Sequence, residues 1–480
     1  MKRTAVINVV GLTESLIGAH TSRIAAFRQT GGSTRILPAF PAVTCTAQST
    51  YLTGTPPSQH GIVGNGWYDR ELAEVQFWKQ SNHLVHGRKL WEECRERDAA
   101  FTCAKLFWWY NMYSSVDYSI TPRPMYPADG RKVFDIYTWP YSIRPEIKKE
   151  LGEFPFATFW GPAAGKQSPQ WPPDAASRWI AQSAKWVERK YRPTLSLIYL
   201  PHLDYNLQRF GAFAGTNDAQ NGPTVPQFNP AILPDLRAID AIVGELIDFF
   251  SNQSVQVILL SEYSITNANW PVHLNRIFRS AGWLTVKEEL GLELLDCGAS
   301  KVFAVADHQV AHVYLNDRSL EKSVRELMEK QEGVEKVLGK NEKITAGIDH
   351  TRAGDLIAVA EENAWFTYYY WREDDFAPDF ARTVDIHRKP GYDPVELFLD
   401  PKIDFPKAKI AWRLLRKKLG FRMLMDVIPL DATLVKGSHG AQPKNPADYP
   451  LLISQRPQLL TNPLVEATDV YHILKRHLLA

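Results

Sequence analysis

Short, continuously apolar runs alternate with longer amphipathic segments along this chain. The apolar runs are rich in β-branched residues and lie at 4–10 (TAVINVV), 194–200 (TLSLIYL) and 255–260 (VQVILL). Such runs predict strands buried on both faces, as in a parallel sheet covered by helices. Helical patterns lie between them at 22–30, 87–98, 176–191 and 235–251. The alternation predicts an α/β fold, with a mainly parallel sheet sandwiched between helices.

Two regions interrupt this alternation. Residues 106–175 are rich in Trp, Tyr and Pro, and a long irregular segment inside an α/β fold is typically a lid or binding-loop insertion. Residues 286–395 carry their own strand, helix and strand pattern, which predicts an inserted α+β cap. We therefore expect one domain spanning residues 1–480, with these two regions as insertions in it.

The overall charge gives no case for binding to a nucleic-acid polymer or a membrane surface. The 480 residues include 55 Lys and Arg against 53 Asp and Glu, a net charge of +2. An anionic substrate must therefore be held by a local site. The basic stretch at 413–422 (RLLRKKLGFR) is interpreted as a solvated helix face.

The four cysteines and the N-terminus indicate the compartment. No CxxC spacing or zinc-finger histidine accompanies the cysteines, which favours reduced thiols. The first residues turn polar too early for a signal peptide, and no run reaches about 18 apolar residues. We therefore expect a cytoplasmic protein; the sequence leaves its oligomeric state open.

Candidate chemistry follows the predicted strands, because ligands gather at the carboxyl ends of parallel strands. Asp204 follows the second apolar run and Glu262 follows the third. Thr44 opens a predicted helix after the proline-containing loop FPAV. A Thr at this position most often caps the helix. Alternatively, its hydroxyl faces a phosphoryl group drawn to the helix N-terminus.

Residues 40–69 (FPAVTCTAQSTYLTGTPPSQHGIVGNGWYD) carry a resemblance. They resemble the nucleophile region of the alkaline phosphatase superfamily, most closely of the nucleotide pyrophosphatase/phosphodiesterase (type I phosphodiesterase) family. The matching pieces, in order, are Pro41, Thr44, Thr53-Gly54, Pro57, His60-Gly61-Ile62 and Asn65. A late GSHG at 437–440 adds a weaker match.

The resemblance implies hydrolysis of a phosphodiester or pyrophosphate bond in a small molecule. One or two divalent metal ions, Zn²⁺ or Mn²⁺, would assist, and a phospho-threonine would form on Thr44, which would also ligate a metal. Asn65 would bind a phosphoryl oxygen. The expected metal ligands are Asp204, Glu262 and His439.

Three positions depart from the family pattern. Val10 stands where the first-strand Asp belongs, Gln208 replaces the His of Asp-x-x-x-His, and Tyr263 replaces the His that follows the second carboxylate. Gln is a poor ligand for Zn²⁺.

Several alternatives therefore stay open. His202, His273, Asp385 or His387 could complete a rearranged site. Asp204, Glu262, Gln208 and Thr44 could instead hold one Mn²⁺ or Mg²⁺. A non-catalytic binder of a phosphorylated metabolite is the alternative function. Monoesterase, sulfatase or mutase activity is a weaker option, and the formylglycine motif of sulfatases is missing from VTCTAQ.

Other polar and aromatic positions have structural interpretations. His60 is expected to anchor a loop, and His308 and His312 to serve structural roles beside a predicted strand. The aromatic run at 365–375 predicts a half-buried strand in the cap.

Overall fold

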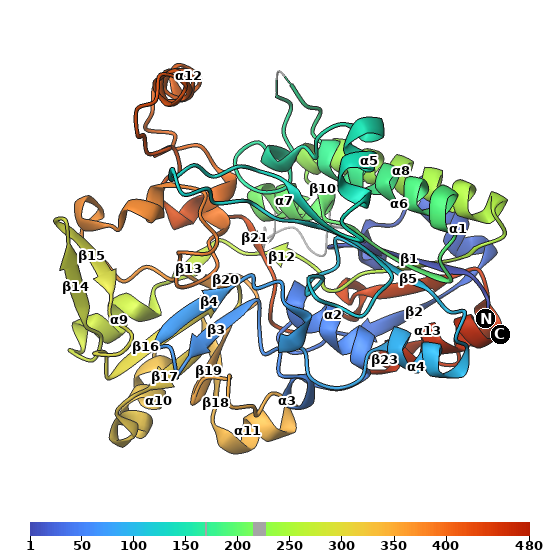
Figure 1. Cartoon of the computed structure of the whole chain (residues 1–480). Coiled ribbons are helices and arrows are strands. Elements are labelled where there is room, and N and C mark those ends of the chain that lie inside the picture. The colour runs from blue at the N-terminus through green and yellow to red at the C-terminus, as the bar shows by residue number, and fades with distance from the viewer. Residues whose placement is uncertain (169, 215–226) are drawn as a thin grey trace.

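The computed structural model describes residues 1–168, 170–214 and 227–480. A nine-stranded sheet runs through the centre of the larger part of the molecule (Figure 1). In spatial order its strands are β23 (Leu464–Glu466), β2 (Gly32–Leu37), β22 (Leu451–Ser454), β11 (Gln256–Leu260), β1 (Thr4–Val9), β8 (Leu195–Leu200), β5 (Cys103–Leu106), β6 (Tyr118–Pro122) and β7 (Ile136–Trp139).

The middle of this sheet is parallel. β1 pairs in parallel with β11 and β8, and β5 pairs in parallel with β8 and β6, whereas β22 and β7 are antiparallel to their neighbours. Every residue of β1 and β8 is buried. The three apolar runs thus form the expected strands, and the predicted mainly parallel α/β fold is confirmed.

Helices cover both faces of the sheet, as Figure 1 shows. One face carries α1 (Ser22–Thr30), α5 (Ile143–Leu151), α6 (Ala175–Tyr191), α7 (His202–Phe210) and α8 (Leu233–Asn252). The other carries α2 (Thr44–Thr53), α4 (Leu90–Arg97) and α13 (Asp469–Leu479), with α3 (Pro57–His60) beside α2. The four helices expected from periodicity correspond to α1, α4, α6 and α8.

A second, antiparallel sheet lies to one side of the first. Its strands are β16 (Val302–Asp307), β17 (Val310–Leu315), β19 (Leu356–Ala360) and β18 (Val334–Leu338), and the helices α9 (Leu274–Ser280), α10 (Glu321–Glu329) and α11 (Lys340–Thr345) accompany it. Its hydrophobic core also takes in Tyr68, Phe77 and residues within 427–435. The second sheet is therefore fastened to segments from both ends of the chain.

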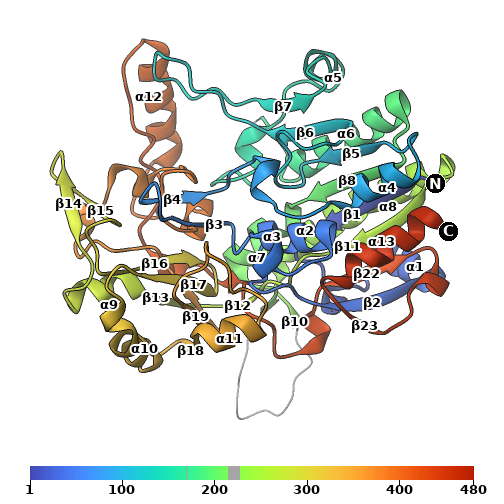
Figure 2. The same cartoon turned by 60° about the horizontal axis from the view of Figure 1, so that its bottom comes forward.

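Short pairings complete the described structure. They join β3 (Gly66–Asp69) to β4 (Glu74–Phe77), β9 (Phe213–Ala214) to β10 (Gln227–Phe228), β12 (Thr266–Asn267) to β21 (Gly437–Ser438), β13 (Trp270–Val272) to β20 (Ala364–Phe366), and β14 (Val286–Glu289) to β15 (Leu292–Leu295). A further helix, α12 (Pro406–Lys418), stands away from the body of the molecule in both views (Figure 2).

Two segments differ from their sequence-based expectation. Residues 106–175 are more regular than their composition indicates, because β6 and β7 extend the main sheet and α5 packs beside them. In the run at 365–375, only Ala364–Phe366 pairs as a strand, and the following aromatic side chains, Tyr368 to Trp371, are fully buried. The rings fill the second core instead of alternating between core and solvent.

Candidate active site

Thr44 is the first residue of α2 and lies at the carboxyl edge of the main sheet. Val43 before it is extended, and α2 ends at Gly54, which adopts a left-handed conformation. The Thr44 hydroxyl shares a 3.0 Å hydrogen bond with the phenol of Tyr263, and Val43 occupies the capping position. Thr44 therefore does not act as the helix cap that its position suggested.

Asn65 fixes the start of the same helix. Its Oδ1 accepts a 3.0 Å hydrogen bond from the backbone N–H of Cys45. Its backbone N–H and its Nδ2 donate to the two carboxylate oxygens of Asp307, at 2.7 and 3.0 Å. Asn65 thus stands beside the start of α2, next to Thr44, and the carboxylate of Asp307 occupies its donors.

Two carboxyl groups accompany Thr44 in a closed environment. Glu262 follows β11 and is fully buried, and Asp204 lies in the first turn of α7, 8% exposed. Burial raises the pKa of Asp204 to about 7 and that of Glu262 to about 8. Asp204 Oδ1 and Glu262 Oε2 have no hydrogen-bond partner among the described residues.

Four aromatic rings form a column next to these carboxyl groups. Tyr263 stacks on His439 with 3.7 Å between ring centroids, and His308 stacks on Tyr392 at 3.5 Å. The rings of His439 and His308 lie 3.6 Å apart and are tilted by 37°. His439 Nδ1 donates to the carbonyl of Ala42 at 2.8 Å, so its Nε2 carries the lone pair. The tertiary structure therefore brings His439 to the site between two other rings.

Gln208 lies at the far end of this column. The hydroxyl of Tyr392 donates to Gln208 Oε1 at 3.1 Å. Gln208 is fully buried, one helical turn after Asp204 on α7. The oxygen of this amide is thus already engaged, whereas its Nε2 has no hydrogen-bond partner among the described residues.

Sequence reasoning missed several residues of this site. Gln48 Nε2 donates to Glu262 Oε1 at 2.5 Å, and Asn8 Nδ2 donates to the same oxygen. Asp307 and Tyr392 come from segments distant in sequence. A polar Asn8 inside an apolar strand was the one signal available, because a buried polar group needs a partner.

The other candidate ligands are held elsewhere. His273 Nδ1 bonds to Thr367 Oγ1 at 2.7 Å, and His387 Nδ1 bonds to the carbonyl of Phe77 at 3.3 Å. His202 Nε2 lies 2.9 Å from Asp235 Oδ1. Within the described ranges, no hydrogen bond or ring contact joins these histidines to Thr44 or Glu262. Asp385 donates its backbone N–H to Glu396 in a loop of the second core.

The remaining histidines divide between structural and site positions. His60 is buried and links Thr50 Oγ1, at 3.0 Å, to the N–H of Ile62, at 3.1 Å. His312 is buried between the carbonyl of Val63 and the N–H of Gly354. Both confirm their structural interpretation, whereas His308 lies in the ring column.

The donors present do not fit a pair of zinc ions. In residues 1–168, 170–214 and 227–480, no three His, Cys, Asp or Glu side chains gather as a metal centre requires. Val10, at the position of the missing carboxylate, is packed in the hydrophobic core. Asp204 Oδ1 and Glu262 Oε2 are oxygen donors, which suit a hard divalent cation better than Zn²⁺.

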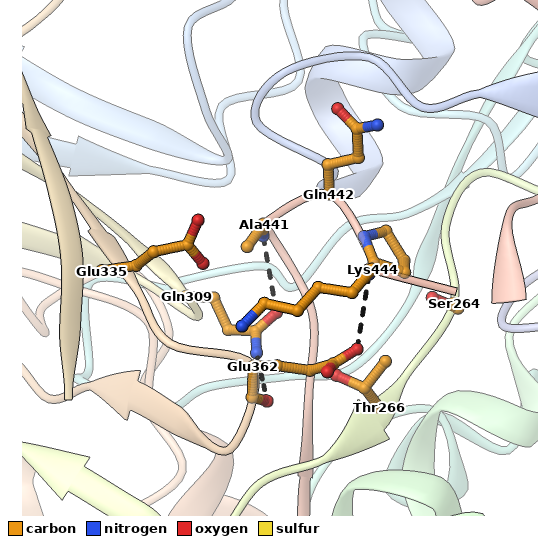
Figure 3. Close-up of a pocket in the computed structure, with 9 residues that line it drawn as sticks. Ser264, Thr266, Gln309, Glu335, Glu362, Ala441, Gln442 and Lys444 are labelled. Atoms are coloured by element: carbon orange, nitrogen blue, oxygen red, sulfur yellow. Dashed lines mark hydrogen bonds between the residues drawn. The ribbon is translucent and has the colours of Figure 1, made fainter. Parts of the chain in front are cut away.

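A shallow hollow opens beside the ring column. It is open to solvent, and its lining residues are Ser264, Thr266, Gln309, Glu335, Glu362, Ala441, Gln442, Pro443 and Lys444 (Figure 3). Gln309 follows His308, and Ala441 lies two residues after His439. Thr44, at 4% exposure, lies below the surface. A substrate can therefore reach Thr44 only if the surrounding side chains move.

Comparison with solved structures supports this fold assignment. Murine ectonucleotide pyrophosphatase/phosphodiesterase 5, in an inactive form with AMP, is 14% identical, with a TM-score of 0.56 and coverage of 100% of this chain and 95% of that one. Phosphonoacetate hydrolase from Sinorhizobium meliloti 1021 with phosphonoacetate is 13% identical, with a TM-score of 0.59 and the same coverages. A comparison with curated proteins found no significant match.

The sequence itself matches the model of a known protein family. Residues 4–393 match the type I phosphodiesterase / nucleotide pyrophosphatase family. This match includes Thr44, Asn65, Asp204 and Glu262 and ends before His439. The chain therefore belongs to the type I phosphodiesterase / nucleotide pyrophosphatase family of phosphoric diester hydrolases.

Proposed function

We propose that this protein hydrolyses a phosphodiester or pyrophosphate bond in a small molecule, with Thr44 as the nucleophile. The observation that carries the proposal is the position of the Thr44 hydroxyl at the start of α2, bonded to Tyr263 rather than to its own helix. A helix N-terminus favours a phosphoryl group by its dipole and its free N–H groups. AMP and phosphonoacetate, bound by the structural neighbours, support a small substrate.

Asn65 is assigned to a phosphoryl oxygen. Its amide and backbone N–H donate to the carboxyl oxygens of Asp307, and two donors in this arrangement support binding of a phosphoryl group. A substrate oxygen would compete with Asp307 for the same hydrogen bonds. Donors fixed in place before the reaction stabilise the negative charge on the phosphoryl oxygens.

Asp204 and Glu262 are the groups that would hold a divalent cation, with Thr44 as a further oxygen ligand. Gln48 and Asn8 each donate a hydrogen bond to Glu262 Oε1. These two bonds fix the orientation of the carboxylate and leave Oε2 available for the cation. A bound Mn²⁺ or Mg²⁺ would act as a Lewis acid on the phosphoryl group. His439 has an Nε2 lone pair as a further donor, provided that its ring leaves the column.

Hydrolysis of bis-p-nitrophenyl phosphate tests the proposal. Metal-free protein is titrated with Zn²⁺, Mn²⁺ and Mg²⁺, alongside Thr44→Ala and Thr44→Ser. We expect metal-dependent turnover that Thr44→Ser retains in part and Thr44→Ala loses by about 100-fold or more. Attack by Thr44 on this diester releases one p-nitrophenolate, so mass spectrometry of quenched wild type should show a p-nitrophenyl phosphate adduct on Thr44.

Equal rates for wild type and Thr44→Ala would contradict the proposal. If all three proteins were inert with every metal, the non-catalytic binder would replace it, although the family match gives that alternative no support. Calorimetric titration with AMP and with inorganic phosphate would then measure binding directly.

A further inference from the structure

The helix α12 presents an apolar stripe to solvent. None of its residues, 406 to 418, is buried. Trp412 is 58% exposed, Leu415 47%, and Leu419 just beyond the helix 64%. Together with Ala408 and Ala411 they follow the i, i+3, i+4, i+7 spacing of one helix face. An amphipathic helix of a globular protein normally turns such a face toward its core, and here it faces outward.

The side of α12 that faces the protein makes both polar and apolar contacts. Lys409 Nζ and Arg413 Nη2 each lie 3.0 Å from the carboxylate of Asp426, and Ile410 packs at the edge of the second core. These contacts fix the rotation of the helix. The apolar stripe therefore faces away from the rest of the molecule, from which α12 projects in Figures 1 and 2.

Positive charge surrounds the stripe. Residues 406–422 contain seven basic residues and no acidic residue: Lys407, Lys409, Arg413, Arg416, Lys417, Lys418 and Arg422. The other 463 residues hold 48 basic against 53 acidic residues, so the chain outside this stretch is net negative. At 100° per residue, Lys407 and Lys418 border one side of the stripe and Lys409 and Arg416 the other.

We propose that α12 docks this protein on an anionic lipid surface. The stripe of Trp412, Leu415 and Leu419 would enter the interface between headgroups and acyl chains, and the flanking Lys and Arg would contact the negative headgroups. A helix with aromatic and Leu residues on one face and Lys and Arg around it is the form that lies in a membrane interface. This surface does not depend on the proposed hydrolysis.

The charges favour lipid over a second copy of the chain. Two α12 helices packed through their leucines would bring like charges together, and this repulsion opposes pairing. An anionic leaflet attracts each of these residues instead, by about five-fold in affinity per Lys or Arg. The two termini of α12 also carry exposed Phe405 and Phe421, 77% and 58% exposed, which lengthen the apolar edge.

Flotation of the full chain with vesicles tests this inference. Phosphatidylcholine vesicles are compared with vesicles containing phosphatidylserine, at low salt and at high salt. We expect binding only to the phosphatidylserine vesicles and its loss at high salt, because ions then screen the headgroup charge. Hydrolytic activity in solution serves as an independent measurement.

Two double variants separate the contributions of charge and apolar area. Lys417→Glu with Lys418→Glu should reduce binding by about 25-fold or more. Trp412→Ser with Leu415→Ser should reduce it by at least about ten-fold. Lys322→Glu with Lys330→Glu, at exposed positions near α10, is the matched control and should bind as wild type.

Three results would overturn the inference. They are absence of binding to phosphatidylserine vesicles at low salt, equal binding to neutral vesicles, and binding that neither α12 variant weakens. A dimer in light scattering that Trp412→Ser with Leu415→Ser converts to monomer would identify a second copy as the occupant instead.

Discussion

The ring of Tyr263 lies on the ring of His439 with 3.7 Å between centroids and 6° between planes. Tyr263 stands where the family pattern has a histidine, and its hydroxyl also bonds to Thr44. One side chain therefore stands at the position of an expected ligand, covers His439, a second expected ligand, and bonds to Thr44. Tyr263 therefore contributes both to the changed set of metal-ligand positions and to the closing of the site around Thr44.

Tyr263→His should strengthen binding of a divalent metal. The imidazole restores a nitrogen donor next to Glu262 and releases the Thr44 hydroxyl. We expect affinity for Zn²⁺ or Mn²⁺ to rise by roughly one order of magnitude in calorimetric titration. Tyr263→Phe, which removes the hydroxyl and adds no donor, is the control; equal metal binding by the two variants would count against this role.

Asp307→Asn should make the site more receptive to phosphate. The carboxylate of Asp307 now accepts two hydrogen bonds from Asn65, and an amide can accept them only through one oxygen. Hydrogen bonds to a charged group contribute about 1.5–3 kcal/mol, so KM should fall by about ten-fold. Initial rates, or phosphate titration, measure the change. Asn65→Ala should instead weaken binding, and a rise in KM in Asp307→Asn would refute the competition.

Buried histidines should make stability fall in mild acid. Burial lowers the pKa of His60 to about 3 and that of His312 to about 4. The unfolded chain binds a proton near pH 6.5 and the folded protein does not, so each histidine costs stability as pH falls below 6.5. The cost approaches about 1.4 kcal/mol per pH unit for each group.

Urea unfolding of wild type and His60→Asn between pH 7 and pH 5 measures this effect. The raised pKa values of Asp204 and Glu262 act in the opposite sense, because neutral carboxyl groups favour the folded state as pH falls. The comparison therefore uses the difference between the two proteins. As pH falls from 7 to 5, the difference in free energy of unfolding between the two proteins should decrease, by up to about 1.4 kcal/mol per pH unit for one proton. Parallel curves of unfolding free energy against pH would contradict the assignment to His60.

Lys389→Met should destabilise the loop beside the ring column. Lys389 Nζ lies 2.7 Å from Asp393 and 2.8 Å from Glu396, and all three side chains are at most 2% exposed. Removing the cation leaves two buried carboxylates close together, at a cost of about 3–5 kcal/mol. Chemical denaturation measures it, with Arg318→Met at an exposed ion pair as a control that should change stability by less than about 1 kcal/mol.

Local chemistry predicted part of the site. Thr44 and Asn65 lie on one short segment with a family pattern, and Asp204 and Glu262 follow strands whose ends meet at one edge of the sheet. Their proximity follows from the parallel order of β8, β1 and β11. His273 and His387 had suitable chemistry, but their distance from Thr44 depends on how the second core packs, which local patterns do not encode.

The sequence by itself determined the strands, most helices and the family, because hydrophobic periodicity, turn residues and a motif such as the one at 40–69 each lie within a short stretch of chain. The tertiary structure alone decided that Asp307 occupies the hydrogen-bond donors of Asn65, that four rings from four distant segments gather beside Thr44, and that the leucines of α12 face outward. These features depend on contacts between segments far apart in the chain, where packing and the pairing of buried polar groups select among arrangements that local preference leaves equal.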